Sequence, residues 1–279
     1  MDTDRLIPYL VQIQRLNEEI NMAFDLDGQN QLRELDPFRI ELLVKSFNER
    51  LDVLRSSFLP EIWDISSIAI SYYHTRIYVY EVAFHAVRPS PSDLAGPQLS
   101  NNSWYFANAR TEMLIRCLNA ATTYVDHYIS LRPDDIYSLV STDQMKLLYA
   151  ILVLGRLATC VKDDAPLLDA GLVRTMANID YYLASVIQKL EGLLTSDANG
   201  QTRQNYIYHL SFLFQHSRRW YNQLEAAGDT GLTANFPSMF CTDAILPCPK
   251  NNESRKEDQM WSDFVNMGST SIVDAFNIP

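Results

Sequence analysis

Hydrophobic residues recur at every third or fourth position over most of this chain, which is the spacing of an α-helix with one buried face. Boundary signals support the pattern: Asp36 and Pro37 suit the cap and first turn of a helix, and Gly228 suits a left-handed helix end. The pattern predicts seven main helices, at about residues 6–24, 37–59, 67–86, 103–129, 143–161, 172–194 and 203–227. Glycine and Val/Thr alternation are scarce, so strands are not expected. The predicted fold is an all-α bundle of antiparallel neighbours.

Two of these helices are more apolar than the rest. They contain the segments 71–81 and 143–157, which are too hydrophobic for a surface helix and are interrupted by charged residues. In the second segment, Arg156 ends the apolar run well short of the roughly 20 residues that a membrane span requires. We therefore expect both helices at the centre of the bundle, and no association with a membrane.

The helical pattern stops after Gly228, which predicts a helical domain over residues 1–228 and a tail over residues 229–279. From residue 258 onward the tail has three acidic residues and neither Lys nor Arg, and it carries the bulky apolar residues Trp261, Phe264 and Met267. Acidic residues keep such a segment solvated while its large side chains stay available to a partner. An acidic activation segment and an ordinary tail that docks Trp261 on the bundle are both open.

Charge and cysteine spacing exclude several classes of function. The formal net charge is −11, so a broad nucleic-acid-binding face is not expected. Four cysteines are widely separated and none forms a Cys-x-x-Cys pair, which excludes zinc ribbons and thioredoxin-type motifs and indicates a reducing compartment. The four cysteines are Cys117, Cys160, Cys241 and Cys248.

Enzyme motifs are weak in this sequence. An isoprenoid-type helical enzyme would need carboxylates one helical turn apart to hold magnesium, and neither Asp134-Asp135 nor Asp163-Asp164 has a third acid at that spacing. Helix caps and solvated loops explain these pairs better. We expect no enzyme activity, no catalytic residue and no metal site in this chain.

Polar residues within the apolar helix 67–86 are the strongest candidates for a binding site. His74, Tyr78, Glu81 and His85 form one stripe at helical spacing, for which a metal site, a pocket wall and a structural seam between helices remain open. If a small-molecule effector binds, its site is predicted beside this helix, with Arg76 pairing an anionic group of the ligand. The tentative effector-binding residues are Tyr73, His74, Arg76, Tyr80 and Glu81.

The same helix carries a family resemblance. The segment Tyr73-His74-Thr75-Arg76-Ile77-Tyr78-Val79-Tyr80-Glu81, together with Leu131-Arg132-Pro133 and the Leu/Tyr/Ala-rich run 145–157, resembles the middle-homology (regulatory) domain of fungal binuclear zinc-cluster transcription factors. The likeness extends over about residues 35–225. The family carries a six-cysteine zinc cluster at its N-terminus, which this chain lacks, so the resemblance implies zinc only in a separate DNA-binding module.

The resemblance implies a nuclear, fungal regulator of RNA polymerase II transcription whose activity a small molecule tunes. Its expected partners are the transcription machinery or co-regulator proteins, with a homodimer also open and no direct contact between this chain and nucleic acid. The alternatives are a helical scaffold for protein interactions and, less favoured, an isoprenoid-type helical enzyme.

Overall fold

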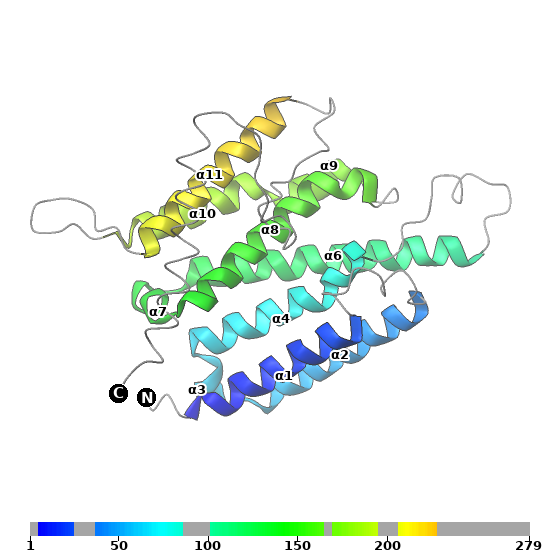
Figure 1. Cartoon of the computed structure of the whole chain (residues 1–279), viewed down its shortest axis with the longest axis horizontal. Coiled ribbons are helices and arrows are strands. Elements are labelled where there is room, and N and C mark those ends of the chain that lie inside the picture. Colours follow the sequence, from blue (N-terminus) through cyan, green and yellow to red (C-terminus); the bar gives the residue numbers. More distant parts are fainter. Residues whose placement is uncertain (1–4, 25–36, 86–100, 165–168, 195–205, 228–279) are drawn as a thin grey trace, which may run out of the picture. The chain divides into compact units, whose positions relative to one another are not determined.

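A computed structural model describes residues 5–24, 37–85, 101–164, 169–194 and 206–227, and these residues contain helices and no strand (Figure 1). The prediction of an all-α fold is confirmed. The helices are α1 (Ile7–Phe24), α2 (Pro37–Ser57), α3 (Pro60–Trp63), α4 (Ser66–His85), α6 (Asn101–Ser130), α7 (Pro133–Ser138), α8 (Ser141–Asp164), α9 (Ala170–Ala177), α10 (Ile179–Glu191) and α11 (Tyr206–Ala227). None of these helices is long and apolar enough to cross a membrane.

Six of the seven predicted helices appear as single helices close to their predicted bounds. The prediction of one helix over 172–194 is wrong, because the chain breaks between α9 and α10 at Asn178. Asn178 has φ 36° and ψ 48°, and its backbone N–H donates to the carbonyl of Arg174 at 2.9 Å. Asparagine adopts this left-handed conformation more readily than other non-glycine residues, so it ends α9 without a glycine.

Two short helices, α3 and α7, lie between the predicted helices and were not predicted. Each begins with a proline, whose fixed φ suits the first turn of a helix. In α7 the Asp135 carboxylate accepts from the backbone N–H of Arg132 at 3.3 Å and from its guanidinium at 2.9 and 3.1 Å. Asp135 therefore stabilises a helix start, as the helix-cap interpretation of the Asp134-Asp135 pair proposes.

The chain divides into two units, Met1–Lys189 and Leu190–Pro279. In the first unit α4 contacts α1, α2, α3, α6 and α8, and so it is the enclosed helix of the bundle. Its residues Ile68, Ile70, Ile77 and Val79 are fully buried, which explains why its sequence lacks a polar face. The principal neighbour of α4 is α6, which packs on both α4 and α8. The centre of this unit thus includes α6 beside the two helices that the sequence indicated.

In the second unit, the described residues comprise the end of α10 and the following turn up to Leu194, and α11. Ile207, Leu210 and Phe214 of α11 are buried, and the Gln215 amide donates to the Glu191 carboxylate at 2.7 Å. The predicted boundary at residue 228 and the tail with Trp261, Phe264 and Met267 lie outside the described residues.

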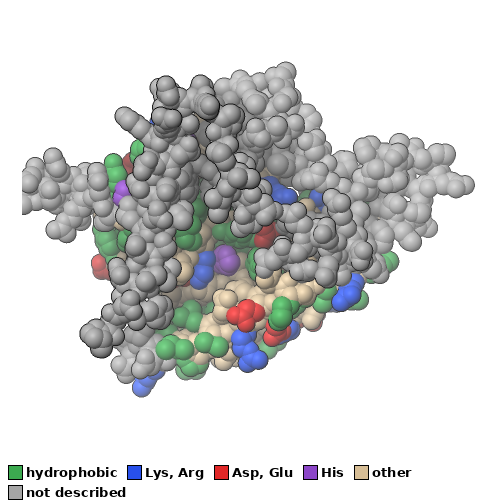
Figure 2. Space-filling view, in the orientation of Figure 1, with side chains coloured by type: hydrophobic (Ala, Val, Ile, Leu, Met, Phe, Trp, Pro, Cys, Tyr) green, Lys and Arg blue, Asp and Glu red, His purple; other side chains and the backbone are tan. Residues whose placement is uncertain are grey.

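Surface charge on the first unit is mixed. At the bottom of Figure 2, over α1 and α2, acidic and basic side chains stand among hydrophobic ones, and neither sign forms a continuous patch in that view. Between these two helices, Arg50 of α2 pairs with Glu19 of α1 at 2.6 Å. The expectation that this chain makes no direct contact with nucleic acid stays a prediction.

Candidate effector site around helix α4

The five residues predicted for an effector site all lie on α4, but they face different neighbours. Tyr73 contacts the rings of Trp63 and His127, with centroids 5.9 and 5.1 Å away. The other four fall into two pairs. His74 and Glu81 contact Tyr149 of α8, whereas Arg76 and Tyr80 lie toward α2 and α6, as the residues that they contact show. The structure therefore distributes the predicted residues over several surroundings.

His74 and Glu81 belong to a mostly buried polar cluster between α4 and α8. The Tyr149 hydroxyl donates to the Glu81 carboxylate, and the ring centroids of Tyr149 and His74 are 5.0 Å apart. Close by, the Lys146 ammonium donates to Ser71 Oγ at 2.8 Å and pairs with Asp143 at 2.7 Å. These contacts tie α8 to α4 through side chains from both helices.

Burial decides the protonation of this cluster. It raises the pKa of Glu81 above its usual range, against the lowering effects of the Tyr149 hydrogen bond and of Arg156. Burial, assisted by the nearby Lys146 ammonium, lowers the pKa of His74 to about 3. His74 is therefore neutral at physiological pH, and its Nδ1 has no hydrogen-bond partner among the described residues. A neutral imidazole that touches aromatic rings is consistent with the seam interpretation of the stripe.

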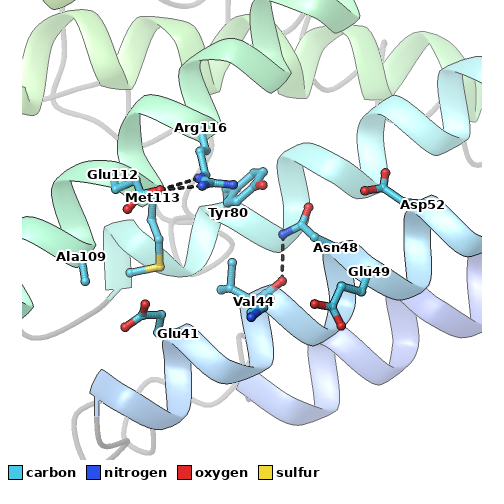
Figure 3. Close-up of a pocket in the computed structure, with 11 residues that line it drawn as sticks. Glu41, Val44, Asn48, Glu49, Asp52, Tyr80, Ala109, Glu112, Met113 and Arg116 are labelled. Carbon is cyan, nitrogen blue, oxygen red and sulfur yellow. Dashed lines mark hydrogen bonds and ion pairs between the residues drawn. The ribbon is translucent and has the colours of Figure 1, made fainter.

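A groove of about 310 Å³ lies on the other side of α4 (Figure 3), and we name it the α2–α6 groove. Six of its residues come from one face of α2: Glu41, Val44, Lys45, Asn48, Glu49 and Asp52. Four come from one face of α6: Ala109, Glu112, Met113 and Arg116. The remaining lining residue is Tyr80 of α4. Because α4 packs against both α2 and α6, the side chain of Tyr80 forms the floor of the groove between them.

The floor of the groove is apolar and buried. Val44, Tyr80 and Met113 are 6, 4 and 7% exposed. Figure 3 shows the Met113 side chain extending from α6 toward α2, with the ring of Tyr80 beside Arg116. Ligand pockets in proteins commonly combine such a floor with a few polar groups in a volume of roughly 300–1,000 Å³. The α2–α6 groove therefore has the volume of a small-molecule site and an apolar floor, but its rim is more polar than is usual for such sites.

Side-chain contacts lie near both ends of the groove. At one end Tyr105 of α6 donates its hydroxyl hydrogen to Glu41 at 2.5 Å, and its ring stacks on Phe38 at 4.9 Å. At the other end Arg76 lies 3.6 Å from Asp52 and donates to the Tyr72 hydroxyl at 3.4 Å. Along α2 the distance from Glu41 to Asp52 is about 16 Å at the helical rise per residue.

The charged side chains that line the groove differ in whether they have partners within the protein. Arg116 donates to Glu112 at 2.5 and 3.0 Å, and its hydrogen bonds to Glu112 and then Tyr80 raise its pKa. In contrast, neither Lys45 nor Glu49 has an ion pair or side-chain hydrogen bond with any described residue. Asn48 Nδ2 donates to the Val44 carbonyl at 2.8 Å, while its buried Oδ1 has no partner in the described parts of the chain. The groove thus holds one ammonium, one carboxylate and one amide oxygen that no described residue engages.

Of the five predicted residues, Tyr80 lines this groove and Arg76 holds one of its ends through Asp52. Sequence reasoning missed the contributions of α2 and α6. The charged positions 41, 45, 49 and 52 do recur at helical spacing and could have marked one face of α2, but no local pattern assigns that face to a groove. Within the described ranges no group of three or more His, Cys, Asp or Glu side chains could hold a metal ion.

Comparison with known proteins gives one finding that bears on function. The chain is 22% identical over 222 residues to a protein described as "Transcription factor himD" from Aspergillus japonicus. The aligned region covers 79% of this chain and 35% of that protein, so the chain spans about a third of the length of the curated relative that it matches. No family model matches the chain, and no solved structure matches it.

Proposed function

We propose that this chain is the regulatory portion of a fungal transcription factor that acts in the nucleus on RNA polymerase II transcription. The observation that carries the proposal is the similarity to a protein described as a transcription factor, which extends over 79% of this chain. Two further features support it. The two long segments that resemble the middle-homology pattern fall in α4 and α8, inside the bundle, and they bring no catalytic motif with them. The chain is proposed to act without enzyme activity.

The proposed effector site is the α2–α6 groove, with Tyr80 as its floor. A ligand there would contact α2, α4 and α6 at once, so its binding free energy would depend on how these three helices are placed. A ligand can shift a conformational equilibrium only by as much as its affinity differs between the two states. A ligand that contacts three helices would bind with different affinity to states in which those helices are placed differently.

The regulatory role is tested by tethering. The 279-residue chain, fused to a heterologous DNA-binding domain in yeast, should change reporter transcription relative to that domain alone. The matched control is Leu154→Asp, which places a carboxylate at a fully buried position of α8 and should unfold the first unit. The regulatory role is refuted if the intact fusion and the DNA-binding domain alone give equal reporter output in both an activation and a repression format.

The tail is proposed to be the activation segment that contacts the transcription machinery. Residues 250–279 alone, fused to the same DNA-binding domain, should activate the reporter. Replacement of Trp261 and Phe264 by Ala should abolish activation, because these side chains would enter an apolar groove of the partner. Val273→Ala is the control for loss of an apolar side chain in the same segment. Equal activation by all three fusions would show that the segment does not act through its aromatic residues.

A further inference from the structure

We propose that the α2–α6 groove takes an organic amine, a ligand with one ammonium group on a compact apolar body. The inference rests on the proposed function in one respect, that the ligand acts as an effector. The chemical class of the ligand follows from the lining of the groove alone. Three observations carry it: the balance of charge, an acceptor without a partner, and the buried aromatic floor.

The charge balance favours a cation. Four carboxylates line the groove against two basic side chains, Lys45 and Arg116. Arg116 is held by Glu112 and Tyr80, so it is not available to a ligand anion without loss of those contacts. A cleft lined mainly by one sign of charge attracts ligands of the opposite sign. Glu112 and Asp52 are in turn engaged by Arg116 and Arg76, so the surplus that a ligand meets is the formal charge of the lining, four carboxylates against two basic side chains.

Arg76, the residue expected to pair an anionic ligand, is also engaged. Its guanidinium faces Asp52 at 3.6 Å and the Tyr72 hydroxyl at 3.4 Å, at the end of the groove. Its side chain is 33% exposed, so it is partly shielded from solvent. An anion at Arg76 would compete with Asp52, which is itself a lining residue of the groove.

Hydrogen-bond acceptors are in place for an ammonium group. Asn48 commits its amide donor to the Val44 carbonyl and leaves its buried Oδ1 without a partner among the described residues. The neighbouring Glu49 carboxylate also lines the groove, and no described residue pairs with it. An ammonium group has three donors and no acceptor, so it matches a lining rich in acceptors better than an alcohol, which has a single donor.

The floor accommodates the rest of the ligand. Val44, Tyr80 and Met113 present buried apolar surface, and an aromatic ring beside an ammonium adds an attractive cation–π interaction. The thioether of Met113 also adapts readily to the shape of an apolar ligand. The volume of about 310 Å³ suits a ligand with one ring or a short hydrocarbon chain.

The test is a binding measurement on the purified 279-residue chain with ¹³C-methyl-labelled methionine, whose Met113 signal is assigned by Met113→Leu. The probes are phenethylamine, 2-phenylethanol and 3-phenylpropionate, which share a phenyl ring and differ in charge. Only the amine should shift the Met113 signal in a saturable way. Equal shifts with the alcohol or the carboxylate, or no saturable shift with phenethylamine at millimolar concentration, would overturn the proposal.

Two variants are expected to change the affinity for phenethylamine in opposite directions. Glu49→Gln should weaken phenethylamine binding about tenfold, the effect of one charge-assisted hydrogen bond. Lys45→Gln should strengthen it, because it removes the basic side chain that no described residue pairs. Glu18→Gln, an exposed position of α1 outside the groove, is the charge-matched control and should leave binding unchanged. Equal affinity of the Glu49→Gln and Glu18→Gln variants would refute the assignment.

The measurement needs no DNA and no reporter, so its failure is distinct from failure of the proposed function. Amine binding without any reporter effect in the tethering experiment would refute the regulatory role and keep the ligand class. A reporter effect without amine binding would keep the regulatory role and refute the ligand class.

Discussion

Lowering the pH from about 7 to about 5 should destabilise the protein through His74 by an amount that can be worked out in advance. Buried among α4 and α8, this imidazole has its pKa lowered from 6.5 to about 3. At pH 5 the unfolded chain carries a proton on this residue, whereas the folded chain does not. Because the unfolded state binds more protons over this range, stability is fully present above pH 6.5 and is lost as the pH falls toward 3.

The loss of stability between pH 7 and pH 5 depends mainly on the pKa of His74 in the unfolded state. With an unfolded pKa of 6.5 and a folded pKa of about 3, the linkage relation gives a loss of about 2 kcal/mol between pH 7 and pH 5. A folded pKa one unit higher would change this figure by less than about 0.1 kcal/mol, because the folded imidazole would still be mostly neutral at pH 5. The expected loss is thus insensitive to how strongly burial acts.

The assay compares urea unfolding of the wild type and of His74→Leu at both pH values. Leucine fills a similar volume beside the Tyr149 ring, so at pH 7 the variant should lie within about 1.5 kcal/mol of the wild type. At pH 5 the variant should gain about 2 kcal/mol relative to the wild type. Glu81 titrates in both proteins and cancels from this difference. If both proteins lose the same free energy of unfolding between pH 7 and pH 5, the account of His74 is wrong.

Three further changes test other parts of the structure by urea unfolding. Tyr149→Phe should lower the free energy of unfolding by about 1–3 kcal/mol at pH 7, because Glu81 loses its hydrogen-bond donor. Burial already raises the pKa of Glu81 and loss of this hydrogen bond raises it further, so the difference in stability between variant and wild type should shrink as the pH falls toward 4.5. A difference that grew over this range would contradict the account. Asn178→Ala should cost about 1 kcal/mol and Asn178→Gly almost nothing, because only alanine is strained at φ 36°; equal costs would argue against the left-handed helix end. Leu154→Ala should cost about 2–5 kcal/mol at its fully buried position, whereas Leu172→Ala, which is 55% exposed, should cost less than about 0.5 kcal/mol; similar losses in the two variants would contradict the burial of α8.

Helix α4 shows how far the sequence leads toward the candidate site. At about 100° per residue, His74 and Glu81 fall on one arc of the helix, and Arg76 and Tyr80 fall on another. The sequence thus contains the division of the predicted residues into two groups. It does not say which neighbour each arc meets, because that depends on residues from 41 to 149 that come together only on folding.

The break at Asn178 marks a second boundary of sequence reasoning. Hydrophobic spacing continues through α9 and α10, so the pattern predicts one helix. The backbone turns there because asparagine tolerates the left-handed region and its N–H can still bond to Arg174. That tolerance permits a helix end but does not require one, so the local sequence leaves both outcomes open.

The sequence by itself determined the helical fold class, the positions of most helices and the enclosure of α4, because the spacing of apolar residues and helix-end chemistry are local properties of the chain. Only the tertiary structure decided that α2 and α6 flank Tyr80 as the walls of a groove, and that carboxylates from both walls surround it. Those walls lie more than fifty residues apart in the chain. Their meeting depends on how whole helices cross, which no local pattern of residues records.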